Sequence, residues 1–339
     1  MSRTQRPSIS DVAEAAGVSR AAVSKVIRNA YGVSPAMRAR VDAAIEQLEY
    51  RPRTGARAMR GRSYTIGIEI PHLGNEFFTQ VMRGAVDRLA GSPYQLIIAP
   101  ALGGASGEPV LEALVDRQVD GIIAISPDVH PSRLDRLASF VPIVLLGRKD
   151  QSSRYDTVDN DDSSGTQQVM DHLFTLGHRR IAHLTIDPAM DFQEARDAHA
   201  IRRAEYLRLM AAAGLEAQLV YTEWFEPDAY ANAVRVLDSD DPPTAIFAGN
   251  DTLAIGALRA VADAGLSAAE VSVVGYDDMD LARHPLLSLT TVDQFGERMG
   301  AEAIDLLMER IDGTRAEPQH ITISPELRVR SSTRPVAGS

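Results

Sequence analysis

Two periodicities divide the chain into an N-terminal head and a longer body. Between Ser8 and Tyr50, apolar residues recur every three or four positions in short runs, which is the spacing of amphipathic helices. From Thr65 onward, short continuous apolar runs alternate with amphipathic stretches until about residue 311. The pattern predicts an all-helical head followed by an α/β body.

The first two apolar runs predict a helix-turn-helix. Ser8 and Asp11 have the spacing of a capping box, and Gly17 supplies the permissive backbone of a tight turn. Ser19 then caps a second short helix, and in such motifs the second helix enters the DNA major groove. The expected buried side of this second helix contains Ala22, Val23, Val26 and Ile27.

A third helix and a basic segment complete the head. Ser34 is the expected cap, Pro35 takes the first helical position, and Val41, Ala44, Ile45 and Leu48 form an apolar stripe. Five arginines then occur between Arg51 and Arg62. Taken alone, such a run fits a flexible basic linker as well as a DNA-contacting segment.

The body contains two successive α/β units. Continuous apolar strands between amphipathic helices indicate parallel sheets covered on both faces, so we expect two doubly wound lobes. Ligands of such folds bind beyond the carboxyl ends of the strands, which here places a site in the cleft between lobes. The predicted strands are 65–70, 95–99, 121–125 and 143–146 in the first unit, and 181–184, 219–221, 245–247 and 271–274 in the second.

Charge is distributed unevenly along the chain, and this changes what the acidic composition implies about a nucleic-acid partner. The net charge of the whole chain is −11, which by itself argues against a nucleic-acid partner. Residues 1–62, however, hold 12 Lys and Arg against 5 Asp and Glu, a net charge of +7 that leaves −18 for the remainder. A basic head on an acidic body is expected of a protein that touches DNA at one end.

Composition also excludes several classes of protein. The sequence contains no cysteine, so disulfides, thiolate zinc sites and cysteine nucleophiles are absent. No apolar run has the length of a membrane span, and the polar, basic start lacks the apolar core of a signal peptide. We therefore expect a cytoplasmic protein that contacts no membrane.

The head resembles the LacI/GalR (lactose-repressor) family of transcription regulators. The match rests on Asp11-Val12-Ala13, Ala16-Gly17-Val18-Ser19, Val33-Ser34 and Tyr50-Arg51-Pro52. In that family the basic linker becomes a hinge helix on DNA, and two hinge helices of a dimer open the minor groove. Met59 occupies the position of the usual leucine wedge, and Arg53 replaces a frequent asparagine.

This resemblance assigns the DNA contacts. Arg20 and Lys25 are suited to guanine, Ala21 to a thymine methyl group, and the serines, Asn29 and the hinge arginines to phosphates. The predicted DNA-binding residues are Ser8, Ser19, Arg20, Ala21, Ser24, Lys25, Asn29, Arg53, Ala56, Arg57, Met59 and Arg60.

The family's body is similar to periplasmic sugar-binding proteins, in which the chain crosses between the lobes three times. The helix at about 295–311 should therefore return to the first lobe. The expected domains are a helix-turn-helix domain at 1–52, a hinge helix at 53–62, a first lobe at 63–160 plus 293–318, and a second lobe at 161–292 plus 319–339.

The resemblance also implies which residues bind an effector. Arg202 matches the arginine that grips the effector, although Glu205 replaces the family's glycine. A guanidinium binds a sugar diol or a carboxylate through two hydrogen bonds. Asp277 corresponds to the hydroxyl acceptor opposite this arginine. Asp251 is expected to cap a helix, which would leave Asn250 free for ligand hydroxyls.

Four further candidates each have a structural alternative. Asn75 either caps a helix or lines the cleft, and Phe77 either contacts ligand or belongs to the core. Arg148 either faces ligand or ends a strand. Trp224 either stacks on a sugar or a planar base, or is a partly buried core residue.

These features predict a ligand-controlled repressor that binds a near-palindromic double-stranded DNA operator as a homodimer. The absence of an apolar heptad tail argues against a coiled-coil tetramer. A sugar suits the effector residues, a nucleoside stays open, and so does the choice between inducer and co-repressor. A solute-binding protein would lack the head, and an enzyme is disfavoured because no catalytic motif, metal ligand set or cofactor motif is present.

Overall fold

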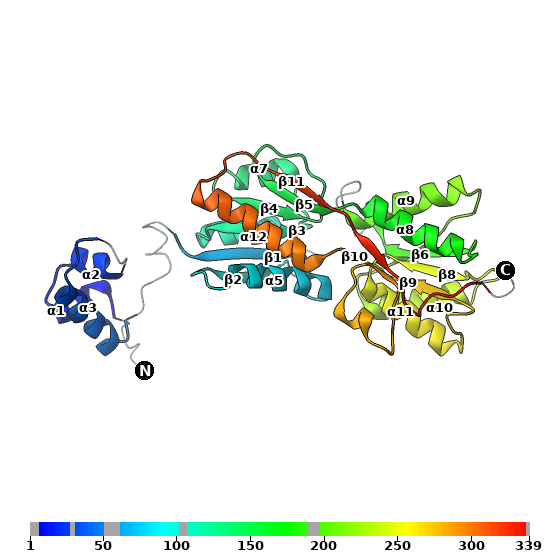
Figure 1. The fold of residues 1–339 in the computed structure, drawn as a ribbon, viewed down its shortest axis with the longest axis horizontal. Helices are drawn as coiled ribbons and strands as arrows, with labels where there is room; N and C mark the ends of the chain where they lie inside the picture. Colours follow the sequence, from blue (N-terminus) through cyan, green and yellow to red (C-terminus); the bar gives the residue numbers. More distant parts are fainter. Residues whose placement is uncertain (1–6, 28–30, 51–61, 102–106, 189–196, 337–339) are drawn as a thin grey trace. The chain divides into compact units, whose positions relative to one another are not determined.

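The structure is a computed structural model that describes residues 7–27, 31–50, 62–101, 107–188 and 197–336. It contains two compact units, residues 1–63 and 64–339, which are described separately below (Figure 1). The hinge helix expected at 53–62 falls almost entirely outside the described residues.

Within residues 7–27 and 31–50, the head has three helices, α1 (Ile9–Ala16), α2 (Arg20–Ile27) and α3 (Pro35–Gln47). The predicted capping box is confirmed, because the Ser8 amide donates to Asp11 Oδ2 at 2.6 Å and the Asp11 amide donates to Ser8 Oγ at 3.4 Å. Gly17 ends α1 with a φ of 61°. The buried core of the head is formed by Val12, Ala13, Ala16, Val23, Val26, Val41, Ala44 and Tyr50.

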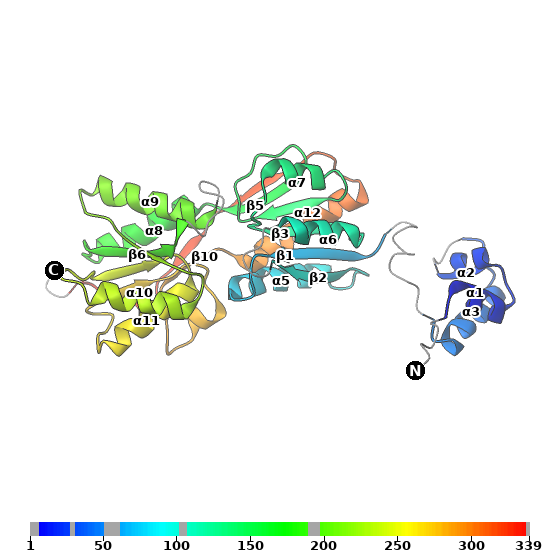
Figure 2. The same ribbon diagram turned by 180° about the vertical axis from the view of Figure 1, so that it is seen from behind.

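The described part of the first lobe contains a six-stranded sheet in the order β11-β5-β4-β3-β1-β2, and every pair in it is parallel. Helices cover both faces, as the continuous apolar strands predict (Figure 2). The elements are β1 (Thr65–Ile70), α5 (Glu76–Leu89), β2 (Gln95–Pro100), α6 (Glu108–Asp116), β3 (Gly121–Ile125), α7 (Pro131–Leu137), β4 (Ile143–Leu146), β5 (Asp156–Asn160), α12 (Gly296–Asp312) and β11 (His320–Ile323).

The described part of the second lobe contains a four-stranded parallel sheet in the order β7-β6-β8-β9. Helices α10 and α11 pack on one face and helices α8 and α9 on the other. The elements are α8 (Asp162–Thr175), β6 (Ile181–Ile186), α9 (Ala198–Ala212), β7 (Gln218–Thr222), α10 (Glu226–Leu237), β8 (Ala245–Ala248), α11 (Asp251–Asp263), β9 (Ser272–Val274) and the 3-10 helix η2 (Asp280–Arg283).

Three chain segments join the two lobes. The chain crosses between β5 and α8, between β10 (Thr291–Asp293) and α12, and between β11 and β12 (Glu326–Arg328). The strands β10 and β12 pair with each other in antiparallel fashion beside the second sheet. Figure 1 shows β11, in red, beside β5. Its residues lie in the range 319–339 that we assigned to the second lobe, but the parallel ladder with β5 places them in the first sheet.

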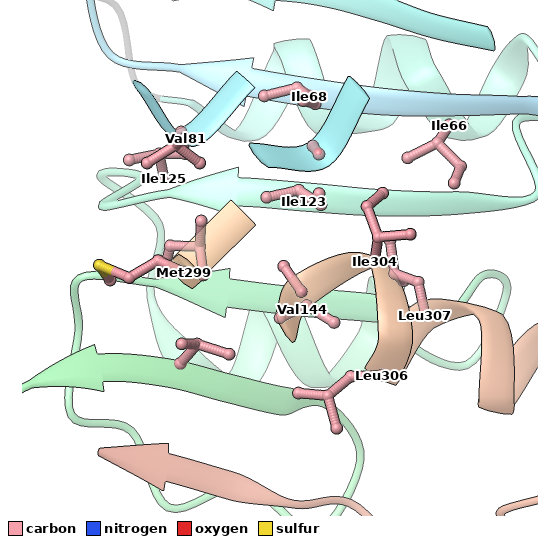
Figure 3. Close-up of a cluster of buried hydrophobic side chains, with 14 of the residues drawn as sticks. Ile66, Ile68, Val81, Ile123, Ile125, Val144, Met299, Ile304, Leu306 and Leu307 are labelled. Atoms are coloured by element: carbon pink, nitrogen blue, oxygen red, sulfur yellow. The ribbon is translucent and has the colours of Figure 1, made fainter. Parts of the chain in front are cut away.

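Helix α12 returns to the first lobe, where it packs on α5 and on one face of the sheet. Figure 3 shows this core, in which Met299, Ile304 and Leu307 of α12 meet side chains of β1, β3 and β4. In β1, Ile66, Ile68 and Ile70 belong to this face, whereas Gly67 and Glu69 alternate onto the face covered by α6 and α7.

Candidate functional site

The second helix of the head presents basic side chains at its surface. Arg20, Ala21 and Lys25 of α2 are exposed, as are Ser8 and Ser19 before α1 and α2. The Ser19 hydroxyl accepts a hydrogen bond from the Ala22 amide at 3.2 Å, so this residue caps α2 as predicted.

One predicted DNA contact is placed differently from the others. Ser24 has a relative exposure of 9% and lies among the buried residues of α2, beside Val23 and Val26. Ser24 is therefore less accessible to a phosphate than the exposed Ser8 and Ser19. The predicted contacts Asn29, Arg53, Ala56, Arg57, Met59 and Arg60 lie outside the described residues.

A cavity of about 520 Å³ lies between the two lobes of the body. Its walls come from the carboxyl ends of strands in both lobes and from the helices and loops that follow them, and its volume is in the range of small-molecule sites. The structure brings all seven predicted effector residues to this cavity: Asn75, Phe77, Arg148, Arg202, Trp224, Asn250 and Asp277.

Arg202 lies in the second turn of α9, where it is almost fully buried. Its Nε donates to Asp162 Oδ1 at 2.8 Å, and Nη1 donates to the Gly249 carbonyl at 2.6 Å. The guanidinium also lies over the ring of Tyr276, with Cζ 3.6 Å from the ring centroid. These contacts fix the orientation of the guanidinium before any ligand arrives.

Asp277 faces Arg202 across the second-lobe end of the cavity. Its φ of 121° is rare for a residue other than glycine, and such strain is concentrated at functional sites. Its carboxylate accepts hydrogen bonds from Gln294 and, at 3.4 Å, from Asn75 Nδ2. Burial raises the pKa of Asp277 to about 7, although the charge of Arg202 acts in the opposite direction.

Arg148 is held mainly by the protein itself. Its Nη1 donates to the carbonyls of Pro127 and Val129 at 2.7 and 2.8 Å, and its Nη2 pairs with Asp150 at 2.8 Å. The side chain is only 1% exposed. It therefore does more than end a strand, since it joins β4 to the loop after β3 at the wall of the cavity.

The helix cap that we expected at Asp251 is formed by Asn250 instead. Asn250 caps α11, because its Oδ1 accepts a hydrogen bond from the Leu253 amide at 2.9 Å. Asp251 is completely buried and instead accepts hydrogen bonds from the Met279 amide and the Thr291 hydroxyl, at 2.9 and 2.5 Å. Asn250 still lines the cavity, and its amide nitrogen is the group left for a ligand.

The two candidates on α5 combine structural roles with a place at the cavity. Asn75 caps α5 by accepting a hydrogen bond from the Phe77 amide at 2.8 Å, and its Nδ2 reaches Asp277 of the other lobe. Phe77 and Phe78 are both 8% exposed and belong to the first-lobe core. Asn75 and Phe77 thus combine the structural role with a place at the cavity wall, and their contact with a ligand stays a prediction.

An aromatic wall closes one side of the cavity. The ring of Trp224 lies 5.4 Å from that of His72 and 5.5 Å from that of His199, between ring centroids. Phe225 is 5.9 Å from His72. Burial lowers the pKa of His72 and lowers that of His199 further, so both imidazoles are neutral near pH 7. The wall is therefore uncharged and suited to stacking.

Sequence reasoning missed Asp162, His72, His199 and Glu69, all of which line the cavity. Asp162 follows β5, a strand that we did not predict, and His199 lies in the first turn of α9, before the start that we predicted for this helix. Glu69 had a signal, because it interrupts the apolar run of β1.

Glu69 is fully buried, and neither carboxyl oxygen has a hydrogen-bond partner of ordinary geometry among the described residues. Burial raises its pKa to about 8, while the nearby Ile125 backbone and the charge of Arg148 act to lower it. A protonated carboxyl group at neutral pH is the expected state of the empty cavity.

Other classes of site were sought in the described residues. No group of three or more His, Asp or Glu side chains there is arranged to hold a metal ion. In the same part of the chain, no helix is long and apolar enough to cross a membrane.

Two family models match the chain. The model described as bacterial regulatory proteins, lacI family, matches residues 8–53, and the periplasmic binding protein-like domain matches residues 170–333. The ribose operon repressor of Escherichia coli (strain K12) is 33% identical over 331 residues, which cover 95% of this chain and 98% of that protein.

Two solved structures are similar to nearly the whole chain. A transcriptional regulator CelR–cellobiose complex has a TM-score of 0.69 and 30% identity, covering 96% of this chain and all of the other. The lac repressor dimer bound to operator has a TM-score of 0.79 and covers 97% of this chain and 100% of the other chain. At 24% identity, that second likeness concerns the fold.

Proposed function

This chain belongs to the LacI family of bacterial regulatory proteins, and we propose that it is a repressor whose binding to an operator is controlled by a sugar in the cavity between the lobes. The observation that carries this proposal is the composition of the cavity. Arg202, Asp277 and Asn250 offer hydrogen-bonding groups at one end, beside the neutral aromatic wall around Trp224.

A sugar fits these walls in two ways. Its hydroxyl groups bind polar side chains that are already held in place, and its C–H faces stack on an aromatic ring. A relative of this chain has been solved with cellobiose, a neutral disaccharide. The cavity volume of about 520 Å³ is compatible with a mono- or disaccharide.

The head supplies the operator contacts. We assign base readout to the exposed side chains of Arg20, Ala21 and Lys25 on α2, and phosphate contacts to Ser8 and Ser19. The burial of Ser24 gives it a weaker claim than these residues. The hinge contacts, centred on Met59 and its neighbouring arginines, are carried over from the family resemblance alone.

The proposed coupling between the sites uses bonds that cross between the lobes. Three side chains of α5 reach the second lobe: Asn75 binds Asp277 at 3.4 Å, Gln80 binds the Asp278 carbonyl at 2.8 Å, and Arg83 binds Asp280 at 2.9 Å. A ligand that competes for Asp277 changes the balance between two lobe arrangements, because it binds them with different affinities.

The active form is proposed to be a homodimer assembled through the first lobe. The edge strand β2 exposes two adjacent apolar side chains, Ile97 and Ile98, at 42% and 49%. An apolar edge strand of this kind is normally covered by another chain. Two heads are what a near-palindromic operator requires.

Enzymatic and transport functions are less consistent with these features. The relatives are transcription regulators, and the head matches a DNA-binding family model. A protein that only carries solutes does not need a DNA-binding head. Because the relatives are regulators, we also propose no catalytic role for the cavity.

The first experiment uses Trp224, the single tryptophan of the sequence, as a reporter inside the cavity. Its emission is followed during titration with ribose, cellobiose and other neutral sugars, and with nucleosides. We expect a saturable change with one sugar, weakened at least about tenfold in Asp277→Ala, since hydrogen bonds to charged groups contribute that much.

A second measurement links this binding to DNA. Sites selected by the protein from a random DNA library should share a near-palindromic sequence, and the bound sugar should change their affinity. Selection of no common sequence, or saturable binding by nucleosides alone, would contradict the proposed function.

A further inference from the structure

We propose that the preferred effector carries a basic amino group, as an amino sugar does, and that Glu69 binds this group. The inference rests on the proposed function, because it names the chemical class of the effector within the same cavity. It is carried by the position of Glu69, by the absence of a side-chain partner for its carboxyl group among the described residues, and by the charges around it.

The position of Glu69 is unusual for the sheet. It lies in β1 between Ile68 and Ile70, and its side chain belongs to the sheet face covered by α6 and α7. Ile68, which Figure 3 shows, belongs to the opposite face. The neighbouring positions on this face are apolar, Ala124 and Leu145 among them. An apolar residue would thus satisfy the fold better than a carboxylic acid.

The carboxyl group lies at the cavity wall near the start of α6. A Cβ atom added to Gly107, the residue before that helix, would be 3.0 Å from Glu69 Oε1. Both residues line the cavity. Gly107 itself therefore places no side chain against the carboxyl group, and any larger residue at this position would press on Glu69 Oε1.

No cation of the described residues neutralises Glu69. The positive charge that acts on Glu69 is that of Arg148. The Arg148 guanidinium, however, donates to two backbone carbonyls and pairs with Asp150 at 2.8 Å. No side chain of the described residues donates a hydrogen bond to either carboxyl oxygen of Glu69, and only the Ile125 backbone acts on this group from nearby. An ionised carboxylate is strongly disfavoured in such a place unless a ligand supplies the opposite charge.

A neutral hydroxyl group would not require an acid at this position. Asparagine, glutamine or serine binds a hydroxyl without the large desolvation penalty of a carboxylate. An ammonium group, by contrast, forms its strongest hydrogen bonds with a carboxylate. Asp277 accepts hydrogen bonds from Gln294 and Asn75, whereas no described side chain donates to Glu69, so an amine accounts for this glutamate better than a hydroxyl does.

The remaining charges of the cavity favour the same class of ligand. Besides Glu69, the walls contain four aspartates and only two arginines, one of which pairs with Asp162. The two histidines are neutral because burial lowers their pKa. Both arginines are paired with aspartates, so neither is left to bind an anionic sugar, whereas the surplus carboxyl groups can ionise beside a cation. The four aspartates are Asp128, Asp162, Asp197 and Asp277.

The test compares matched sugars by the emission of Trp224. The probes are glucose, glucosamine, N-acetylglucosamine and glucose 6-phosphate, together with cellobiose and the β-1,4-linked disaccharide of glucosamine. We expect the full-length protein to bind the amino form of one sugar about ten- to a hundredfold more tightly than its neutral, acetylated or phosphorylated form. In Glu69→Gln this preference should vanish, while the affinity for the neutral sugar changes little.

Two variants control the comparison. Glu69→Asp keeps the charge and should keep part of the preference, whereas Glu112→Gln removes a carboxylate from the exposed side of α6 and should leave the preference unchanged. A neutral sugar that binds as tightly as its amino form, or a preference that survives Glu69→Gln, overturns the inference and leaves a sugar-responsive repressor. Failure of every sugar to bind overturns the proposed effector class and this inference with it.

Discussion

At the scale of single residues, the cavity is built from side chains that also stabilise the fold. Asn75 and Asn250 each cap a helix with one amide atom, and each lines the cavity. Arg202 is fixed by Asp162 and by the Gly249 carbonyl. The loss of such a residue therefore changes stability and ligand binding together, unless the substitution is chosen to separate them.

Asn250 allows this separation. Serine caps a helix about as well as asparagine, so Asn250→Ser should stay within about 1 kcal/mol of the parent in unfolding free energy, whereas Asn250→Ala should lose about 1 kcal/mol more. Both variants lack the amide nitrogen and should bind the effector about tenfold more weakly. Urea unfolding and titration of Trp224 emission measure the two effects. Parent-like effector binding by Asn250→Ser would show that Asn250 is a cap only.

At the scale of elements, the first lobe depends on the close crossing of α5 and α12. A Cβ atom added to Gly84 would be 1.8 Å from the Glu297 carbonyl oxygen, and one added to Gly300 would be 2.0 Å from the Val81 carbonyl oxygen. Each glycine thus lets its helix touch the backbone of the other, and this contact presses α12 against the sheet.

Gly300→Ala tests this crossing. Alanine is the better helix former by about 1 kcal/mol, but its methyl group has no space here, so we expect a net loss of about 1–3 kcal/mol in unfolding free energy. Thr79→Ala, at an exposed site on α5, serves as the control and should change stability by less than about 0.5 kcal/mol. Thermal unfolding measures both. A stabilised Gly300→Ala protein would mean that the two helices separate without penalty.

The helices and strands differ in how well the sequence predicts them. The long apolar strands and amphipathic helices of both lobes were predictable, because their periodicity records the faces that they bury. Strand β5 was not predictable, because four of its five residues are polar. Partners distant in the sequence form hydrogen bonds with these residues, as Arg315 does with Asp156 at 2.6 Å. The short strands β10, β11 and β12 depend in the same way on pairing with remote segments.

The site shows the same limit. The effector residues were found through family spacing, whereas the burial of Asp251 depends on Met279 and Thr291, which approach it only in the folded lobe. The absence of a described side-chain partner for Glu69 is likewise a property of the packed cavity and not of the strand sequence.

At the scale of the whole molecule, two heads must be joined for the repressor to act on a symmetric operator, and the exposed edge of β2 is the surface proposed for this purpose. Ile98→Lys places a charge at that edge. We expect a monomer at micromolar concentration and at least about tenfold weaker operator binding, because the second head no longer contributes through effective concentration.

Phe140→Lys is the matched control, since Phe140 is 68% exposed after α7, away from β2 in the sequence. Analytical ultracentrifugation and operator titration should show this variant as a dimer of normal affinity. A dimeric Ile98→Lys protein would place the interface elsewhere.

The return of α12 and β11 to the first lobe has a consequence for synthesis on the ribosome. Strand β1 begins at residue 65, but its sheet is completed only by β11 at residue 320, about 255 residues later. At roughly 5–20 residues per second, translation of this interval takes about 13–50 s. During that time the apolar face of β1, β3 and β4 lacks α12, the helix that covers it. We therefore expect the nascent first lobe to bind chaperones that recognise apolar segments until α12 has emerged.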